Sequence, residues 1–159
     1  MPVYKTTSSK QTKKLAGLLA KKILSRRIKR KNALVLALVG DLGAGKTTFI
    51  QGFLRALGVR KKITSPTFIL MKKIQISKSK FQKKSKTQNF KNVYHIDCYR
   101  IQRAKELLKL GLKEILGNFQ NIVLVEWAER IQRALPKSTI WLKFEHGPKE
   151  NIRSIRIYS

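Results

Sequence analysis

The sequence predicts an α/β domain, in which helices cover both faces of a mainly parallel β-sheet and antiparallel strands follow near the C-terminus. Apolar, strand-like runs alternate with helical segments up to about residue 135, which is the pattern of parallel β-α-β units. Two strand-like segments, TIWLKFEH and IRSIRIYS, then follow one another and alternate apolar with polar residues. The length of 159 residues is typical of a single domain, so we expect residues 1–159 to fold as one unit.

The first predicted elements are a helix and a buried strand. Leucine and isoleucine recur at helical spacing from Leu15 to Ile23, and lysines occupy the other faces. The start of this helix can be capped by one of three hydroxyl-bearing residues, Ser8, Ser9 or Thr12. The run ALVLALV, Ala33 to Val39, has no polar position, which indicates a central strand covered on both faces.

The middle of the chain contains a helix and then a segment of unusual composition. A helix is predicted from Gly45 to Leu57, and Gly58 is placed to end it. A turn at Pro66 leads into a strand-like run that ends near Ile76. Residues 71–92 are rich in lysine, lack acidic residues and hold few large apolar groups, so we expect a flexible or hairpin-like insertion outside the core.

The second half is predicted to alternate strands with helices. Val93 to Asp97 and Asn121 to Trp127 are apolar runs that include an acidic residue at or near the end, and each predicts a strand. One helix is expected from Ala104 to Leu116, in spite of a glycine within it, and a short helix is expected to end by Leu135. The expected core contacts of the longer helix are Leu107, Leu108, Ile115 and Leu116.

The charge of the chain is strongly positive. Lysine and arginine number 36 against 8 aspartate and glutamate residues, which gives a formal net charge of +28. Such a field attracts polyanions, so RNA, a nucleoprotein or an acidic protein surface is a natural partner. The alternative is that a lysine-rich composition decorates the solvated surface of an ordinary fold.

Cysteine content and hydropathy bear on the compartment. Cys98 is the only cysteine, so no internal disulfide can form and a reducing compartment is expected. The longest apolar run, Ala33 to Val39, is far shorter than the roughly 20 residues that cross a bilayer. We therefore expect a cytoplasmic protein without a membrane partner.

The stretch GDLGAGKTTF, Gly40 to Phe49, carries the strongest functional signal. Gly40, Gly45, Lys46 and Thr47 satisfy the pattern G-x-x-x-x-G-K-[ST] between a predicted strand and a predicted helix. Glycines let backbone N–H groups approach a phosphate chain, and the helix N-terminus adds further donors and a positive dipole end. The pattern predicts a P-loop NTPase-like three-layer sandwich, with Lys46 on the β- and γ-phosphates and the Thr47 hydroxyl on Mg²⁺.

Acidic residues are scarce, which shortens the search for a metal partner. Asp97 ends one apolar run, Glu126 lies near the end of another, and Asp41 lies inside the glycine loop. A carboxylate after a strand beside the loop can hold Mg²⁺ or its waters, and a second one can orient the attacking water. Spacing alone leaves open which of Asp97 and Glu126 takes which role, and either can instead pair with a surface lysine.

Four motifs, in this order and spacing, resemble the TsaE (YjeE) family, the ATPase component of bacterial threonylcarbamoyladenosine synthesis on tRNA. They are GDLGAGKTTF, SPTF (Ser65 to Phe68), HIDCYR (His95 to Arg100) and EW (Glu126 and Trp127). The resemblance runs from about Thr12 to Arg156. The lysine-rich stretch from Met71 to Asn92 is longer than the connection usual in the family.

The resemblance implies a role for each matching residue. Residues of the glycine loop would hold the ATP phosphates: Asp41, Gly43, Ala44, Gly45, Lys46, Thr47 and Thr48. Thr47 and Glu126 would coordinate Mg²⁺, while Thr67 and Asp97 would complete the hydrolytic site. Thr12 would approach the nucleotide base, and Trp127 would lie close to the nucleotide. The implied partners are the TsaD and TsaB proteins, with tRNA contacted directly or through the complex.

Two other functions are compatible with the same loop. A small-molecule or nucleoside kinase would need a phosphate acceptor for turnover, and the sequence has no separate lid with clustered arginines. A basic RNA-binding protein with a regulatory nucleotide site would keep its RNA affinity after Lys46→Ala. An ATPase would lose turnover from that substitution.

Overall fold

The computed structural model describes residues 2–25, 30–76 and 90–159. Its elements are β1 (Val3–Thr6), α1 (Ser9–Ser25), β2 (Leu34–Val39), α2 (Lys46–Ala56), β3 (Met71–Gln75), β4 (Asn92–Asp97), α4 (Lys105–Lys109), α5 (Leu112–Gly117), β5 (Asn121–Glu126), the 3₁₀ helix η1 (Ala128–Ala134), β6 (Ile140–His146) and β7 (Arg153–Tyr158). Within these residues the strands form one seven-stranded sheet in the order β1-β7-β6-β2-β5-β4-β3.

The sheet has a parallel centre and antiparallel edges. Strands β6, β2, β5 and β4 pair in parallel, whereas β7 and β1 extend one edge and β3 extends the other in antiparallel register. The predicted fold class is therefore confirmed, including the antiparallel pair near the C-terminus. The strand-like run predicted to end near Ile76 is present as β3, but its antiparallel pairing at the sheet edge was not predicted, and neither was strand β1.

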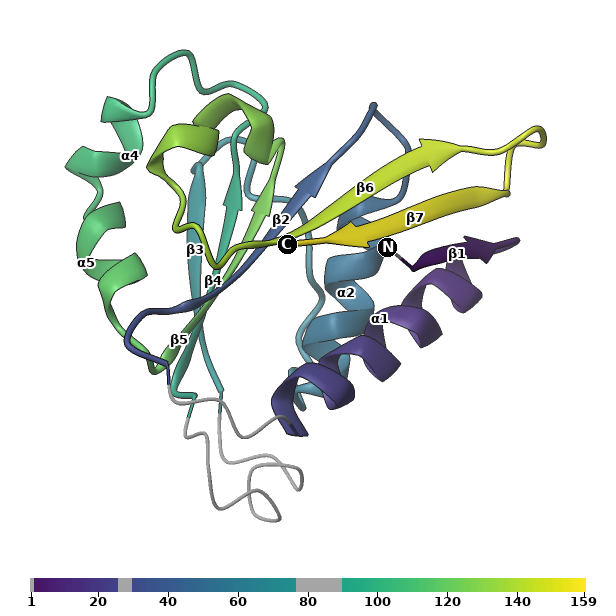
Figure 1. The fold of residues 1–159 in the computed structure, drawn as a ribbon, viewed down its shortest axis with the longest axis horizontal. Helices are drawn as coiled ribbons and strands as arrows, with labels where there is room; N and C mark the ends of the chain where they lie inside the picture. The colour runs from purple at the N-terminus through teal and green to yellow at the C-terminus, as the bar shows by residue number, and fades with distance from the viewer. Residues whose placement is uncertain (1, 26–29, 77–89) are drawn as a thin grey trace.

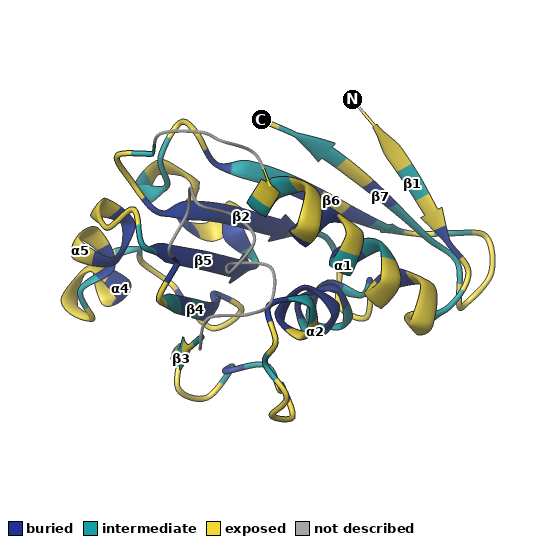
Figure 2. Cartoon of the chain, turned by 90° about the horizontal axis from the view of Figure 1, so that it is seen from below, coloured by how far each residue is buried: buried dark blue, intermediate teal, exposed yellow. Residues whose placement is uncertain are grey.

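Helices cover both faces of the sheet, with α1 and α2 on one side and α4 and α5 on the other (Figure 1). Along β2, the side chains of Leu34, Leu36 and Leu38 enter the core on the α1/α2 side, and Val35 and Ala37 enter the core on the opposite side. Figure 2 shows β2 and β5 buried in the middle of the layers. This two-sided burial explains why the strand at Ala33 to Val39 contains no polar residue.

The helix predicted from Gly45 to Leu57 is present as α2, and Gly58 ends it. Gly58 adopts a positive φ of 86°, and its N–H donates to the carbonyl of Arg55 at 3.0 Å. The N–H of Val59 donates to the carbonyl of Leu54, also at 3.0 Å. Together these bonds satisfy carbonyl groups that the last turn leaves without a helical partner.

The prediction of a single helix from Ala104 to Leu116 is wrong. Gly111 has a φ of 82° and separates two short helices, α4 and α5, because a left-handed residue cannot continue a right-handed helix. Leu107, Ile115 and Leu116 are buried as expected, but the break turns Leu108 outward, where it is 46% exposed.

The lysine-rich insertion is also shorter than predicted. Met71–Gln75 forms strand β3 at the sheet edge, in register with β4. Phe90 is buried, and Ile74 and Ile76 pack against the α1/α2 core. The two ends of the segment 71–92 therefore belong to the folded domain, and its central part lies outside the described residues.

Candidate functional site

A cavity of about 330 Å³ opens where the loop after β2 meets the carboxyl ends of β4 and β5. The ends of parallel strands are the usual place for a ligand site in sheets of this kind. The cavity is lined by Leu42, Gly43, Gly45, Lys46, Thr47, Thr48, Ser65, Thr67, Asp97, Tyr99, Glu126 and Trp127. Of the residues predicted for the site, only Thr12, Asp41 and Ala44 are not part of this lining.

The glycine loop has the backbone shape that the sequence pattern predicts. Gly45 adopts φ 100° as the N-cap of α2, so the loop turns sharply into the helix. Gly40 adopts φ 135°, and a Cβ there would lie 2.2 Å from the carbonyl oxygen of Phe144. Residues with side chains rarely adopt these conformations. The free N–H groups at the start of α2 consequently face the cavity as donors for an anion.

Lys46, the first residue of α2, lies almost fully buried beneath this loop. Its ammonium group donates hydrogen bonds to the carbonyl oxygens of Gly40, at 2.5 Å, and of Asp41, at 2.8 Å. The same nitrogen lies 4.0 Å from the ring centroid of Trp127. Burial lowers the pKa of Lys46 below its ordinary value, while the nearby carboxylates, Glu126 first, act in the opposite direction. A bound anion would favour the charged form further.

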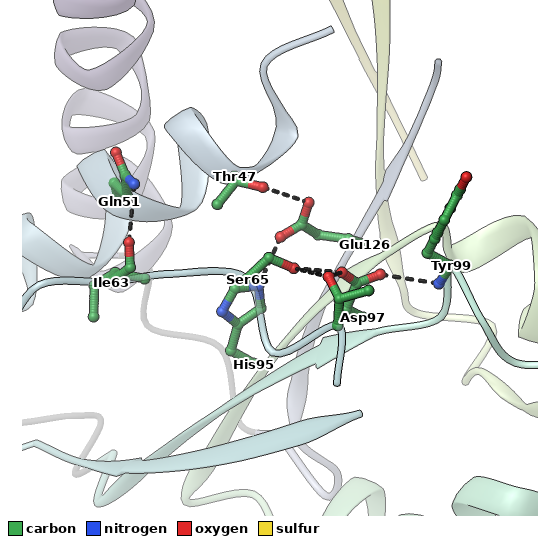
Figure 3. Close-up of polar contacts among 9 residues, drawn as sticks. Thr47, Gln51, Ile63, Ser65, His95, Asp97, Tyr99 and Glu126 are labelled. Atoms are coloured by element: carbon green, nitrogen blue, oxygen red, sulfur yellow. Dashed lines mark hydrogen bonds and ion pairs between the residues drawn. The ribbon is translucent and has the colours of Figure 1, made fainter. Parts of the chain in front are cut away.

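Glu126, the last residue of β5, is hydrogen-bonded to α2 through Thr47. Its Oε2 accepts a hydrogen bond from the Thr47 hydroxyl at 2.8 Å, and its Oε1 lies 2.8 Å from Nε2 of His95. The side chains of both His95 and Glu126 are buried. These two contacts fix both carboxylate oxygens, so that the carboxylate is held beside the start of α2 (Figure 3).

Asp97 lies opposite Glu126 in the β4–β5 register and binds a different loop. Its Oδ2 accepts hydrogen bonds from the hydroxyls of Ser65 and of Thr67, the latter at 2.6 Å. Its Oδ1 accepts from the backbone N–H of Tyr99 at 2.9 Å. The carboxylate therefore anchors the SPTF loop at the edge of the cavity (Figure 3).

The donor set fits Mg²⁺. The Thr47 hydroxyl and the Glu126 carboxylate are hard oxygen ligands that already meet at 2.8 Å. Among the described residues no group of three or more His, Cys, Asp or Glu side chains is arranged to hold a metal by itself. This is compatible with Mg²⁺, which binds through one or two protein oxygens and takes its remaining ligands from phosphates and water.

Three predicted nucleotide-binding residues lie outside the cavity. Thr12 is buried, and its hydroxyl is hydrogen-bonded to the Thr6 hydroxyl at 2.8 Å and donates to the Ser8 carbonyl, which ties β1 to α1. The side chain of Ala44 is fully buried in the core on the α1/α2 side. Asp41 is exposed and contributes its carbonyl oxygen to Lys46.

Several residues at the site were not predicted, among them Leu42 of the lining and His95 beside Glu126. Ser65 binds Asp97 beside Thr67, and the ring of Tyr99 lies 5.1 Å from that of Trp127. From the β6–β7 hairpin, Arg153 donates to the carbonyl of Gly43 at 3.1 Å, and Nε2 of His146 lies 3.1 Å from the carbonyl of Leu42. Ser65 and Tyr99 stand within recognised motifs, SPTF and HIDCYR. No local pattern in the sequence points to Arg153 or His146.

Comparison with known proteins agrees with this geometry. The family model "Threonylcarbamoyl adenosine biosynthesis protein TsaE" matches residues 6–155. The tRNA threonylcarbamoyladenosine biosynthesis protein TsaE of Bacillus subtilis (strain 168) is 35% identical over 137 residues, which cover 86% of this chain and 73% of that protein. The TsaE of Rickettsia typhi (strain ATCC VR-144 / Wilmington) is 39% identical over 134 residues, or 84% of this chain and 78% of that protein.

A solved structure is similar over nearly the whole chain. The crystal structure of Bacillus subtilis YdiB superposes with a TM-score of 0.68 at 28% sequence identity, and the match covers 97% of this chain and 82% of that chain. In the described ranges, no helix has both the length and the apolar character that a membrane crossing requires.

Proposed function

The chain belongs to the TsaE family of tRNA threonylcarbamoyladenosine biosynthesis proteins, and we propose that it is the Mg²⁺-dependent ATPase of that pathway. The observation that carries the proposal is the contact between Thr47 and Glu126. It joins the phosphate-binding helix to a buried carboxylate at 2.8 Å, directly beside the glycine loop. We further propose that the protein acts in the cytoplasm with the TsaD and TsaB proteins, and that its hydrolysis of ATP resets their complex.

The glycine loop, β4 and β5 supply the residues that would bind the nucleotide and its metal ion. The backbone N–H groups from Gly43 to Thr48 would bind the phosphates. Lys46, which donates to the carbonyl oxygens of Gly40 and Asp41, would instead donate to phosphate oxygens. Thr47 and Glu126 would hold Mg²⁺, which would supply charge neutralisation at the reacting phosphates when bound. His95 orients Glu126 from below through the contact at 2.8 Å.

Asp97 is placed to orient the attacking water or to accept its proton. The carboxylate is fixed by Ser65, Thr67 and the N–H of Tyr99, and it faces the same cavity as Lys46. A carboxylate in that position can accept a proton from water or orient it for in-line attack. The ring of Trp127 lines the cavity, with its centroid 4.0 Å from the Lys46 ammonium nitrogen.

The test is calorimetry with ATP and with ADP in millimolar Mg²⁺, followed by ATP hydrolysis assayed alone and with TsaD and TsaB. Lys46→Ala is expected to lower turnover by about 10²-fold or more, the loss typical of removing one preorganised donor. Lys143→Ala is the matched control, because Lys143 is half exposed and forms an ion pair with Glu145 on β6, away from the cavity lining. Hydrolysis without a phosphate acceptor would exclude a kinase. No heat of binding for either nucleotide would overturn the proposal.

A further inference from the structure

A second concave surface is lined by residues of α1, of α2 and of the loop after α2. Figure 1 shows the two helices on the same side of the sheet. The surface is a groove of about 790 Å³. Six of its lining residues are cationic, and the lining in the described part of the chain contains no acidic side chain: Lys13, Lys14, Lys21, Arg55, Lys61 and Lys62. The groove shares no lining residue with the nucleotide cavity.

The floor of this basic groove is made of small residues and backbone. Gly52 brings α2 so close to α1 that a Cβ on it would lie 2.4 Å from the carbonyl oxygen of Lys13. Gly17 and Ala56 face each other beside this contact. The two helices are therefore in close contact here, and the exposed cations of the lining come from α1, from α2 and from the loop after α2: Lys13, Lys14 and Lys21; Arg55; and Lys61 and Lys62. Gln51 closes one end by donating to the carbonyl of Ile63 at 2.9 Å (Figure 3).

The sequence around the groove is almost free of acidic residues. Asp41 is the only acidic residue before Asp97, and the remaining acidic residues lie on η1, α4, α5, the ends of β4 and β5, and the β6–β7 hairpin. The helices α1 and α2 contain no acidic residue at all. Clustered positive charge of this kind creates a positive local potential. A polyanion that binds there releases its own condensed counterions, which favours binding.

We propose that the α1/α2 groove binds the sugar–phosphate backbone of RNA. Six cationic side chains around a groove that also contains small residues suit a chain of phosphates, whereas a protein interface normally has an apolar centre depleted in charge. Leu18, at 56% exposed, is the one large exposed apolar side chain in the lining. RNA is also the polyanion on which the pathway of this family acts.

The inference goes beyond the ATPase assignment, because the groove can bind RNA whether or not the P-loop hydrolyses ATP. The test variant replaces Lys13, Lys14, Lys61 and Lys62 by glutamine in the full chain. The control variant replaces four exposed lysines from the opposite side of the sheet and beyond η1: Lys105, Lys109, Lys113 and Lys137. Each set lowers the formal net charge of +28 by four, so the two proteins carry the same total charge.

The measurement is the affinity for a fluorescein-labelled RNA stem–loop across a series of salt concentrations. The groove variant is expected to lose at least about tenfold in affinity at physiological salt, and its log–log salt slope should fall by about three, as expected for four lost phosphate contacts. The control variant should change the slope by less than about one. Arginine at the same four groove positions should keep the affinity.

Equal losses of RNA affinity in the two variants would overturn the proposal, because they would show that binding depends on the net charge of the protein and not on the groove. Loss of poly-glutamate binding with RNA binding unchanged would also overturn it, in favour of an acidic protein partner. Calorimetry with ATP and circular dichroism accompany each variant. Unaltered nucleotide binding and fold would show that an RNA result concerns the groove alone, and a failure of the ATPase proposal would leave that result standing.

Discussion

Asp97 and Glu126 lie directly opposite one another at the carboxyl ends of the parallel strands β4 and β5, yet they bind different parts of the molecule. Asp97 accepts hydrogen bonds from the loop that contains Ser65 and Thr67, whereas Glu126 accepts from Thr47 of α2 and is in contact with His95. Adjacent carboxylates with separate partners are suited to separate roles in one reaction.

The first prediction therefore concerns this pair. Asp97→Asn should slow ATP turnover by about 10²- to 10⁴-fold while nucleotide affinity stays within a few-fold of the native value, because it removes a proton acceptor. Glu126→Gln should instead raise the Mg²⁺ concentration that supports half-maximal turnover, because it removes a hard anionic ligand. Steady-state kinetics over a Mg²⁺ series, with calorimetry, separates the two effects. A raised Mg²⁺ requirement in Asp97→Asn would contradict this division.

The second prediction concerns Cys98, which follows β4 and is fully buried. Burial, followed by the charge of Asp97, raises the pKa of the thiol from 9.0 to about 12. At pH 8 the folded chain should hold roughly a thousandfold less thiolate than an ordinary thiol, since three pKa units separate them. A disulfide reagent should therefore react with Cys98 only in molecules whose local or global unfolding exposes the thiol. The reaction rate should measure how readily that unfolding occurs.

The same pKa shift gives a sign for stability against pH. Between pH 9 and about 12 the unfolded chain releases the thiol proton that the folded chain retains, so the free energy of unfolding contributed by Cys98 falls as pH rises. Lysines titrate in the same window, so the comparison is with Cys98→Ala, whose denaturant midpoint should fall less steeply. Parallel pH profiles for the two proteins would rule this contribution out.

A third prediction uses the two glycines of the broken helix. Gly111→Ala places a side chain at φ 82° and should destabilise the fold by about 1–2 kcal/mol. Gly117→Ala is the matched control, because it ends α5 and a Cβ there would meet no atom within 4 Å. This change should be neutral or stabilise by up to about 1 kcal/mol. Thermal unfolding should show a lowered midpoint for Gly111→Ala and an unchanged or raised midpoint for Gly117→Ala. Equal shifts would refute the stated role of Gly111.

A fourth prediction tests the contact between α1 and α2. Gly52→Ala would push a methyl group against the backbone of Lys13, at 2.4 Å from its carbonyl oxygen, and should cost about 1–3 kcal/mol as overpacking. Gly17→Ala has its nearest neighbour at 3.8 Å and should be tolerated or slightly stabilising, since alanine favours the helix. Urea denaturation measures both. Tolerance of Gly52→Ala would show that the helices can separate freely at this point.

Much of this molecule is encoded in short stretches of sequence. The P-loop from Gly40 to Thr47 could be predicted because its conformation depends on glycines and on a helix start within a few residues. The strand at Ala33 to Val39 was equally clear, because burial on both faces excludes polar residues. The split at Gly111 and strand β1 were missed, because one glycine in a helical pattern or four residues at an edge carry little local signal.

The sequence by itself predicted the class of ligand, because the glycines, the lysine and the threonine of the loop lie within a few residues of one another. Only the tertiary structure decided which carboxylate meets Thr47, since Glu126 lies 79 residues away and reaches it because β5 pairs with β2. It likewise brought Arg153 to the carbonyl of Gly43 across 110 residues, and set α1 against α2 to form the basic groove. The physical reason is that a turn is specified by its own dihedral angles, whereas the order of strands in a sheet is set by packing among segments far apart in the chain.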